Sequence, residues 1–384
     1  MTIFLGLITP LIAYVVITLL HVAIPAKRVD GYVKNDATGE VRRYRLNGRY
    51  VLAASVILWF LLGYFNIVPY VWLYETRWLG LIGACVIGLA YSLFVVLRVP
   101  PNRASFFADL WFGRSKDPQL KDGFVDAKVW LYLVGAVMLQ LNVLSFAAFH
   151  LQNVESINPG FLLGCAMLTW FCVEYLIFER IHLWTYDFIA ERVGFKLGFG
   201  CLAFYPYFYS VSLWFTADLP NPGIPVWVTV LFGALFLCGW VLTRGANMQK
   251  FYFKSKPGQK FLWIEPQAIS DGNNRLLVNG FWGASRHINY LGEIIQAVAI
   301  ALAPGYFEIW MVWLYPIYYI GLFLSRQIDD DAICQAKYGD LWDEYTSKVK
   351  YRIVPGLYGR GRDPHAEVGL RPPSAGRATP PRRC

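Results

Sequence analysis

Apolar residues stand in long blocks along this chain instead of recurring at a helical or strand period. A run of about 17 apolar residues or more can cross a hydrocarbon core of roughly 30 Å as one helix. Six runs of this kind occur, at residues 3–24, 50–68, 79–97, 129–149, 160–178 and 226–242. The pattern therefore predicts six membrane-spanning helices.

Two further apolar stretches are less regular. Residues 197–217 are rich in aromatic side chains and contain Pro206, and residues 291–324 are long enough for a helical hairpin that turns at Pro304 and Gly305. We therefore expect an all-α polytopic membrane protein with about nine or ten transmembrane helices. The expected membrane domain is 1–358, and the basic segment 359–384, rich in Pro, Gly and Arg, is predicted to be a disordered tail.

Charge composition agrees with this class and orients the chain. Only 16% of the residues are charged, whereas a soluble domain has roughly 25%. Lys and Arg are concentrated in every second loop, after the runs 3–24, 79–97 and 226–242. By the positive-inside rule these loops and the C-terminus face the cytoplasm, and the N-terminus lies on the other side. The net charge of +9 then follows from topology, so we expect membrane lipids, and no nucleic acid, as partners.

Two common kinds of site are not predicted. The seven Cys and five His residues do not cluster with metal-ligand spacing, so we predict no metal. There is also no glycine-rich phosphate-binding motif, so a nucleotide would have to be held by helices and loops.

One carboxylate stands inside an apolar run. Glu174 lies between Val173 and Tyr175 in the run 160–178. An ionisable group at this depth is costly unless it has a partner, and such groups are often functional. Two interpretations remain open: a functional carboxylate, or a packing residue neutralised by a partner on another helix.

Polar chemistry is densest in the C-terminal third, in residues 279–292, 325–331 and 337–345. Arg286 and Asn289 share a face if their segment is helical, and Arg326 and Asp330, four residues apart, share a face where the last span reaches the cytoplasm. Cations, amides and aromatic rings on one surface suit a phosphate-bearing aromatic cofactor. The alternative is ordinary juxtamembrane charge. We therefore predict a cytoplasm-facing cofactor pocket in the half of the domain at about 240–358.

The same residues resemble the signature of the sterol reductase family, which holds Δ14-, Δ7- and C24-sterol reductases and the membrane domain of the lamin B receptor. The family pattern L-L-V-S-G-W-W-G-x-x-R-H-P-N-Y-L-G is similar to residues 276–292, LLVNGFWGASRHINYLG. A second pattern, K-Y-G-x-x-W-x-x-Y-x-x-x-V-x-Y-R-I-x-P-G-x-Y, is matched by residues 337–358. Weaker matches extend upstream, so the resemblance covers most of the chain.

The resemblance implies an NADPH-dependent enzyme that reduces a carbon–carbon double bond of a sterol. The cofactor positions of the family fall on Lys250, Lys254, Leu277, Trp282, Asn289, Arg326, Asp330 and Tyr345, and the motif adds Arg286 and Tyr290.

The chemistry of the reduction requires a proton donor. An isolated alkene has to be protonated to a carbocation before or while hydride arrives, and a carboxyl in an apolar setting or a tyrosine can hold that proton near neutral pH. The candidates are Asp330, Glu174 and Tyr175, in that order. Asp330 could instead position the cofactor through Arg326. We expect the sterol to enter from the bilayer and to lie against Tyr205, Tyr207 and Tyr209.

The reduced bond is assigned from short segments. The family's E-L-R-P-G segment is absent near residues 130–135, and residues 191–195 are similar to the side-chain C24 reductases. We therefore favour the C24 bond, with Δ14 and then Δ7 as alternatives.

Other classes compete with the reductase interpretation. The isoprenylcysteine carboxyl methyltransferases, which use S-adenosylmethionine, share an R-H-P-x-Y-x-G-like motif. A non-enzymatic scaffold and a transporter are the others. The membrane is expected to be the endoplasmic reticulum in a eukaryote or the inner membrane in a bacterium, and no oligomeric state is predicted.

Overall fold

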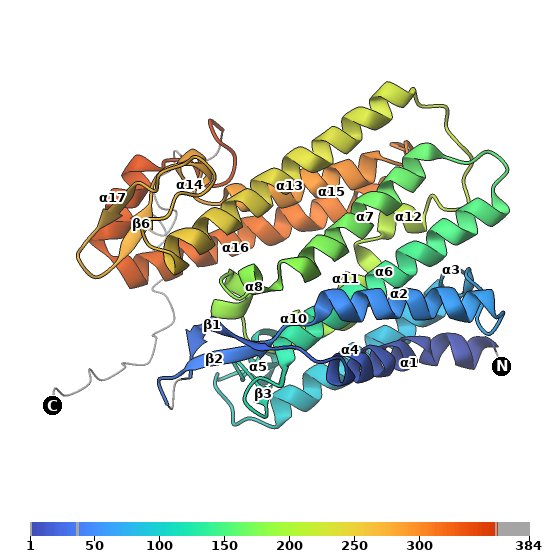
Figure 1. The fold of residues 1–384 in the computed structure, drawn as a ribbon, viewed down its shortest axis with the longest axis horizontal. Helices are drawn as coiled ribbons and strands as arrows, with labels where there is room; N and C mark the ends of the chain where they lie inside the picture. The colour runs from blue at the N-terminus through green and yellow to red at the C-terminus, as the bar shows by residue number, and fades with distance from the viewer. Residues whose placement is uncertain (1, 36–37, 358, 360–384) are drawn as a thin grey trace.

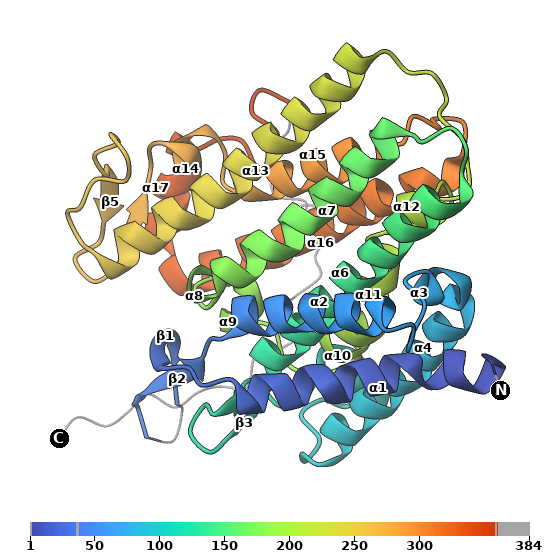
Figure 2. The same cartoon turned by 45° about the vertical axis from the view of Figure 1, so that its right-hand side comes forward.

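The chain forms a bundle of long helices that run roughly side by side (Figures 1 and 2). This computed structural model describes residues 2–35, 38–357 and 359. The predicted basic tail, apart from residue 359, lies outside the described residues.

Five of the described helices are long and apolar enough to cross a membrane. They are α1 (Thr2–Ala23), α4 (Arg77–Leu97), α6 (Ala127–Asn153), α7 (Pro159–Ile177) and α13 (Val226–Ser255). Two apolar helices are shorter, α2 (Gly48–Tyr64) and α15 (Ile288–Leu302). The prediction of an all-α, multi-pass membrane protein is confirmed.

The two irregular stretches also have helical counterparts. Residues 195–214 form a broken helix of α10 (Phe195–Phe199), a π-helical turn at Gly200–Phe204, α11 (Tyr205–Phe208) and α12 (Val211–Trp214). Pro206 has no N–H to donate, which interrupts regular helical bonding here. Residues 288–338 form the predicted hairpin, in which Gly305 at φ +83°, followed by a 3₁₀ turn at Trp310–Trp313, separates α15 from α16 (Leu314–Tyr338).

Each of the nine predicted crossings thus has a helical counterpart, although only five of these are long, uninterrupted apolar helices. Because Pro304 and Gly305 end α15 early and Pro206 breaks the segment 197–217, the length of an apolar stretch in the sequence overestimates the length of its helix.

Short elements connect the long helices. The strands form three antiparallel hairpins: β1 (Arg28–Lys34) with β2 (Val41–Arg45), β3 (Gln119–Leu120) with β4 (Val125–Asp126), and β5 (Ala268–Ser270) with β6 (Arg275–Leu277). The short helices are α3 (Trp72–Glu75), α5 (Phe106–Phe112), α8 (Glu179–His182), α9 (Tyr186–Ile189), α14 (Phe281–Ala284) and α17 (Asp340–Lys348).

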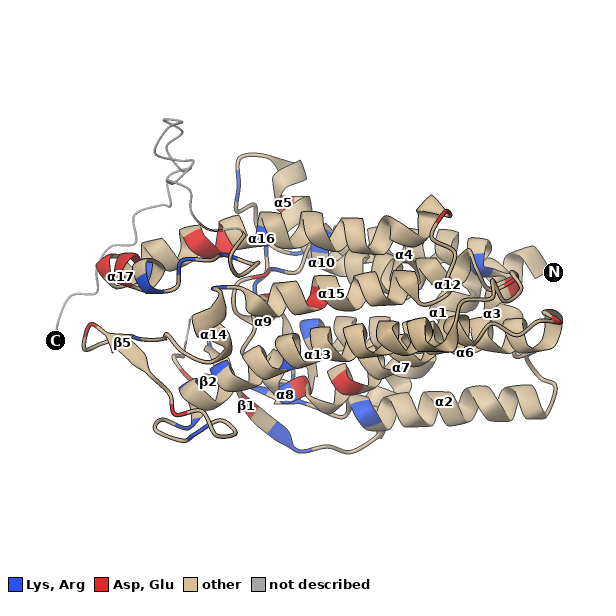
Figure 3. Ribbon diagram, turned by 90° about the horizontal axis from the view of Figure 1, so that it is seen from above, with Lys and Arg blue, Asp and Glu red and all other residues tan. Residues whose placement is uncertain are grey.

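Most Lys and Arg residues gather toward the end of the bundle where β1, β2, β5 and α17 lie, while the N-terminus lies at the opposite end (Figure 3). The basic loops of the sequence therefore share one side of the molecule, as their alternation predicts.

Helix α15 is held close to α13, which positions the residues of the signature motif. A Cβ atom on Gly292 would lie 2.4 Å from Thr243 Oγ1 and 2.5 Å from the carbonyl oxygen of Gly239. The two backbones can approach this closely only because both positions are glycine. Asn289 and Glu293 flank Gly292 in the sequence of α15, so the packing of α13 on α15 determines the direction of their side chains.

Candidate active site

A cavity of about 410 Å³ opens among α7–α11, α13, α15 and α16. Almost all of the predicted site residues line it: Glu174, Tyr175, Tyr205, Tyr209, Lys250, Lys254, Leu277, Trp282, Arg286, Asn289, Tyr290, Arg326, Asp330 and Tyr345. Residues up to 171 positions apart in the sequence therefore face one space.

Tyr207 is the exception. Its hydroxyl lies 2.9 Å from the position of a Cβ on Gly80, so the ring packs against α4 and is not among the residues that line the cavity. The segment 205–208 is helical, so residues four apart share a face and the residue between them points away. Tyr205 and Tyr209 face the cavity and Tyr207 does not.

One end of the cavity is cationic. Lys250 and Lys254 from the end of α13, Arg275 from β6 and Lys337 from α16 line it. Within the described part of the chain none of the four forms an ion pair with a carboxylate. Trp282 is fixed beside them, because its indole N–H donates to the carbonyl of Ala246 at 2.8 Å, and the Lys250 ammonium lies 5.3 Å from the ring centre.

The other end of the cavity is aromatic and apolar. The ring centres of Tyr205 and Tyr209 lie 4.7 Å apart, and Phe171 contacts both rings edge-on. The ring centre of Tyr319 lies 5.4 Å from that of Tyr209. Leu197 and Cys201 from the broken segment complete this wall. Such a surface suits a flat hydrophobic molecule.

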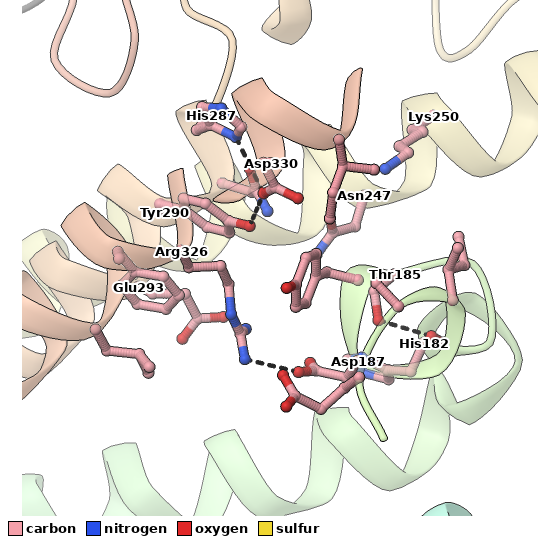
Figure 4. Close-up of a pocket in the computed structure, with 18 of the residues that line it drawn as sticks. His182, Thr185, Asp187, Asn247, Lys250, His287, Tyr290, Glu293, Arg326 and Asp330 are labelled. Atoms are coloured by element: carbon pink, nitrogen blue, oxygen red, sulfur yellow. Dashed lines mark hydrogen bonds and ion pairs between the residues drawn. The ribbon is translucent and has the colours of Figure 1, made fainter. Parts of the chain in front are cut away.

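Charged side chains also line the cavity, and Figure 4 labels Asp187, Glu293, Arg326 and Asp330 among them. Glu174 accepts from Arg244 Nε at 2.8 Å, and both side chains are buried. Arg326 Nη2 donates to Asp187 Oδ1 at 2.8 Å, from α16 to α9. Asp330 accepts from the Tyr290 hydroxyl at 2.5 Å, while His287 Nδ1 lies 3.7 Å from the same oxygen.

These contacts bear on the predicted roles. Arg326 and Asp330 line one cavity from α16, as their spacing predicts, but the ion-pair partner of Arg326 is Asp187. Arg286 and Asn289 both reach the cavity, although Arg286 lies in the connection between α14 and α15 and not on a shared helix. Glu174 has the ion-pair partner that one of its two interpretations required.

Tyr175 lies against a histidine that sequence reasoning missed. The Tyr175 and His182 rings stack at 3.9 Å. Burial and then the nearby Arg244 lower the pKa of His182 well below its usual range. The neutral ring can therefore accept from Arg244 Nη2, which lies 3.3 Å from its Nε2.

Several buried polar atoms in the cavity wall have no hydrogen-bond partner among the described residues. They include Asn289 Oδ1, Glu293 Oε2, Arg326 Nε and the Tyr205 hydroxyl. Buried polar atoms are nearly always paired, so unpaired ones that line a cavity are what a polar ligand would satisfy. Sequence reasoning missed Glu293, although a carboxylate inside the apolar stretch 291–324 was a recognisable signal.

Fold and cavity together define a multi-pass membrane protein in which a cationic pocket opens onto an aromatic one. The chain belongs to the Ergosterol biosynthesis ERG4/ERG24 family, whose model matches residues 7–358. The resemblance to the sterol reductases is thus confirmed, and with it the class, an oxidoreductase acting on CH–CH groups.

Named relatives refine the comparison. The chain is 32% identical to a Delta(14)-sterol reductase of Arabidopsis thaliana over 87% of this chain and 91% of that protein. It is 34% identical to the Delta(14)-sterol reductase TM7SF2 of Mus musculus over 67% of this chain and 61% of the relative. A 7-dehydrocholesterol reductase of Xenopus laevis is 28% identical over 88% of this chain and 76% of its own length.

The preference for the side-chain C24 bond is not supported, because these relatives are named for Δ14 and 7-dehydro sterols, and the Δ14 alternative fits better. The preference rested on one absent segment and one five-residue stretch. Residues 130–135 lie on α6, where Gly135 packs against Tyr205, and Glu191 pairs with Lys196 at 3.0 Å. Both segments thus have packing or pairing roles that do not identify the substrate.

Proposed function

We propose that this protein reduces the Δ14 double bond of a sterol with NADPH. The observation that carries the proposal is the continuity of the cavity. Its cationic end suits a dinucleotide, and its aromatic end suits a sterol ring system. Membership of a family with Δ14-reductase relatives at 32% and 34% identity supports the choice of bond.

The residues at the cationic end fit the cofactor. Lys250 and Lys254 form no ion pair with a carboxylate among the described residues, so they would bind phosphate groups. Trp282 offers a ring held in place by its own hydrogen bond. The unpaired Asn289 Oδ1 would accept from an amide N–H. When bound, NADPH supplies hydride from C4 of its nicotinamide ring.

Asp330 fits a positioning role better than that of an acid. It accepts hydrogen bonds from Tyr290 and lies near His287, and a carboxylate held as an acceptor can bind a ribose hydroxyl. Tyr290 and Arg326 then stand between this carboxylate and the aromatic end. The cofactor would therefore bind with its reactive ring toward the sterol.

The aromatic end would hold the sterol and keep water away from the carbocation. Phe171, Tyr205 and Tyr209 form a wall of rings without a fixed charge. We propose that the sterol reaches it from the bilayer, beside the broken segment 195–214. The cationic end would face the cytoplasm, since the basic loops lie on that side.

A direct test is conversion of a sterol panel (Δ14, Δ7, Δ24 and Δ24(28)) by purified protein in detergent with NADPH, read by mass spectrometry. Reduction of the Δ14 sterol alone, lost in Arg326→Ala, is the expected result. Reduction of the Δ7 sterol instead would move the assignment to the activity for which the Xenopus relative is named. Turnover of none, with S-adenosylmethionine and not NADPH raising the melting temperature, would replace the proposal with the methyltransferase.

A further inference from the structure

Glu293 is a carboxyl group that the proposed contacts leave unused. It lies on α15, four residues after Asn289, so the two side chains share the helix face that looks into the cavity. Its Oε2 is buried and has no hydrogen-bond partner among the described residues. Figure 4 shows its side chain beside Arg326, below Tyr290.

The charged groups around Glu293 do not balance unless one carboxyl keeps a proton. The groups that act on it are Glu174, Arg244, Asp187 and Arg326. Arg244 already pairs with Glu174, and Arg326 already pairs with Asp187. Three carboxyl groups therefore share two guanidinium groups. In an environment of low dielectric the unpaired carboxyl is the one that stays protonated.

Glu293 also stands where a proton would be needed. Its electrostatic neighbours include Tyr209 and Tyr319 of the aromatic end. On the other side, Asn289 and Arg326 lead to the cationic end. A group between the two ends can reach a sterol while the cofactor occupies the pocket beyond it.

The other candidate donors are less well placed to give a proton. Glu174 already accepts from Arg244, Asp330 accepts from Tyr290, and Tyr175 is stacked on His182.

We infer that Glu293 is the proton donor of the reduction, an assignment that rests on the proposed function. The carboxyl O–H bond breaks as its proton forms a C–H bond with one alkene carbon, which leaves a carbocation at the other. Hydride from NADPH then forms the second C–H bond, so the sterol gains two hydrogens and NADPH becomes NADP⁺. The Glu293 carboxylate regains a proton from water through the cationic end.

The test uses the full-length protein with Glu293→Gln, which keeps the size of the side chain and cannot donate a carboxyl proton. Glu308→Gln is the matched control, because Glu308 is exposed in the loop between α15 and α16. Three properties are measured: the affinity for NADPH by tryptophan fluorescence, single-turnover reduction of the sterol, and the infrared band of the Glu293 carboxylic acid. That band is the carbonyl stretch, shifted in D₂O, that remains when the spectrum of Glu293→Gln is subtracted from that of wild type, so that other protonated carboxyl groups cancel.

We expect Glu293→Gln to bind NADPH within about threefold of wild type, to lose the infrared band, and to reduce sterol roughly 10²–10⁴-fold more slowly, the range of general acid catalysis. Glu308→Gln should match wild type in all three. If Glu293→Gln does not fold, Glu293→Asp, which keeps a carboxyl, should retain the band and part of the rate.

Two results overturn the assignment: single turnover in Glu293→Gln close to wild type, or a wild-type protein whose band is absent or survives the substitution. A wild-type protein that reduces no sterol would instead overturn the proposed function itself, while the infrared band would still report whether Glu293 carries a proton.

Discussion

Replacing Glu174 by leucine should destabilise the protein at every pH, whereas replacing its partner Arg244 by leucine should do so mainly near neutral pH. The two side chains are only 5% and 3% exposed, and Glu174 accepts from Arg244 Nε at 2.8 Å. Removing one partner of a buried pair leaves the other charge uncompensated, which typically costs about 3–5 kcal/mol.

The two remaining charges differ in how they can respond. Arginine does not lose its proton in proteins, so Glu174→Leu leaves a fixed charge beside Phe178, whose ring centre lies 4.7 Å away, and His182. Glu293 can offset that charge only by giving up its own proton. In Arg244→Leu the Glu174 carboxyl group has lost its partner, but it can become protonated and so lose its charge. Protonation costs about 1.4 kcal/mol for each unit by which the pH exceeds the ordinary carboxyl pKa of roughly 4.3. The expected cost is therefore about 3.5 kcal/mol at pH 7 and about 1.5 kcal/mol at pH 5.5.

Thermal unfolding in detergent at both pH values measures these costs, on the order of 2 °C per kcal/mol. The double variant should lie within about 1 kcal/mol of wild type, because neither charge of the pair remains without its partner. Equal, pH-independent losses in the two single variants, or a double variant that shows their sum, would refute the reasoning that this is a buried, mutually neutralising pair.

Three further perturbations test other parts of the structure. Lys250→Ala and Lys254→Ala should each raise the Kd for NADPH by about 10- to 100-fold without lowering the melting temperature, as expected for the loss of one charge-assisted contact of about 1.5–3 kcal/mol. If the Kd of both variants is within twofold of wild type, the two lysines do not bind the cofactor. Burial raises the pKa of Glu179, which accepts from the Gly48 N–H at 3.0 Å, to about 7. Because this carboxyl ionises at lower pH in the unfolded chain, wild type should lose up to about 3 kcal/mol of stability between pH 4.5 and pH 7. A Glu179→Gln variant whose melting temperature depends on pH as that of wild type does would contradict this. Gly292→Ala should lower the stability by about 1–3 kcal/mol, since its Cβ would lie 2.4 Å from Thr243 Oγ1. The control Gly321→Ala on α16, whose Cβ would meet no atom within 4 Å, should be neutral or stabilising by up to about 1 kcal/mol. Similar melting temperatures for the two variants would argue against the tight contact of α13 with α15.

The membrane class and the grouping of the site could be predicted from the sequence. Blocks of apolar residues locate the crossings because a bilayer requires length, and length is visible without a structure. Arg326 and Asp330 could be placed on one face because both lie in a regular helix. Even the turn of the hairpin could be placed, since Pro304 and Gly305 are local signals.

The partners across the cavity could not be predicted in the same way. Asp187 and Arg326 are 139 residues apart, and their pairing depends on how α9 packs against α16. Tyr207 was predicted to contact the sterol together with Tyr205 and Tyr209. Which residues of the segment 197–217 share a helix face cannot be worked out until the break at Pro206 is known. The unpaired state of Glu293 is likewise a property of the packed structure, because it follows from where Arg244 and Arg326 direct their guanidinium groups.

The measurement that tests the central claim most directly is the origin of the two new hydrogens in the product. The Δ14 sterol is reduced once in D₂O with ordinary NADPH and once in H₂O with NADPH deuterated at C4 on the transferred face, and each product is analysed by mass spectrometry and NMR. The account predicts one deuterium from solvent on one carbon of the former double bond and one from the cofactor on the other. No reduced product, or two hydrogens from a single source, would contradict it.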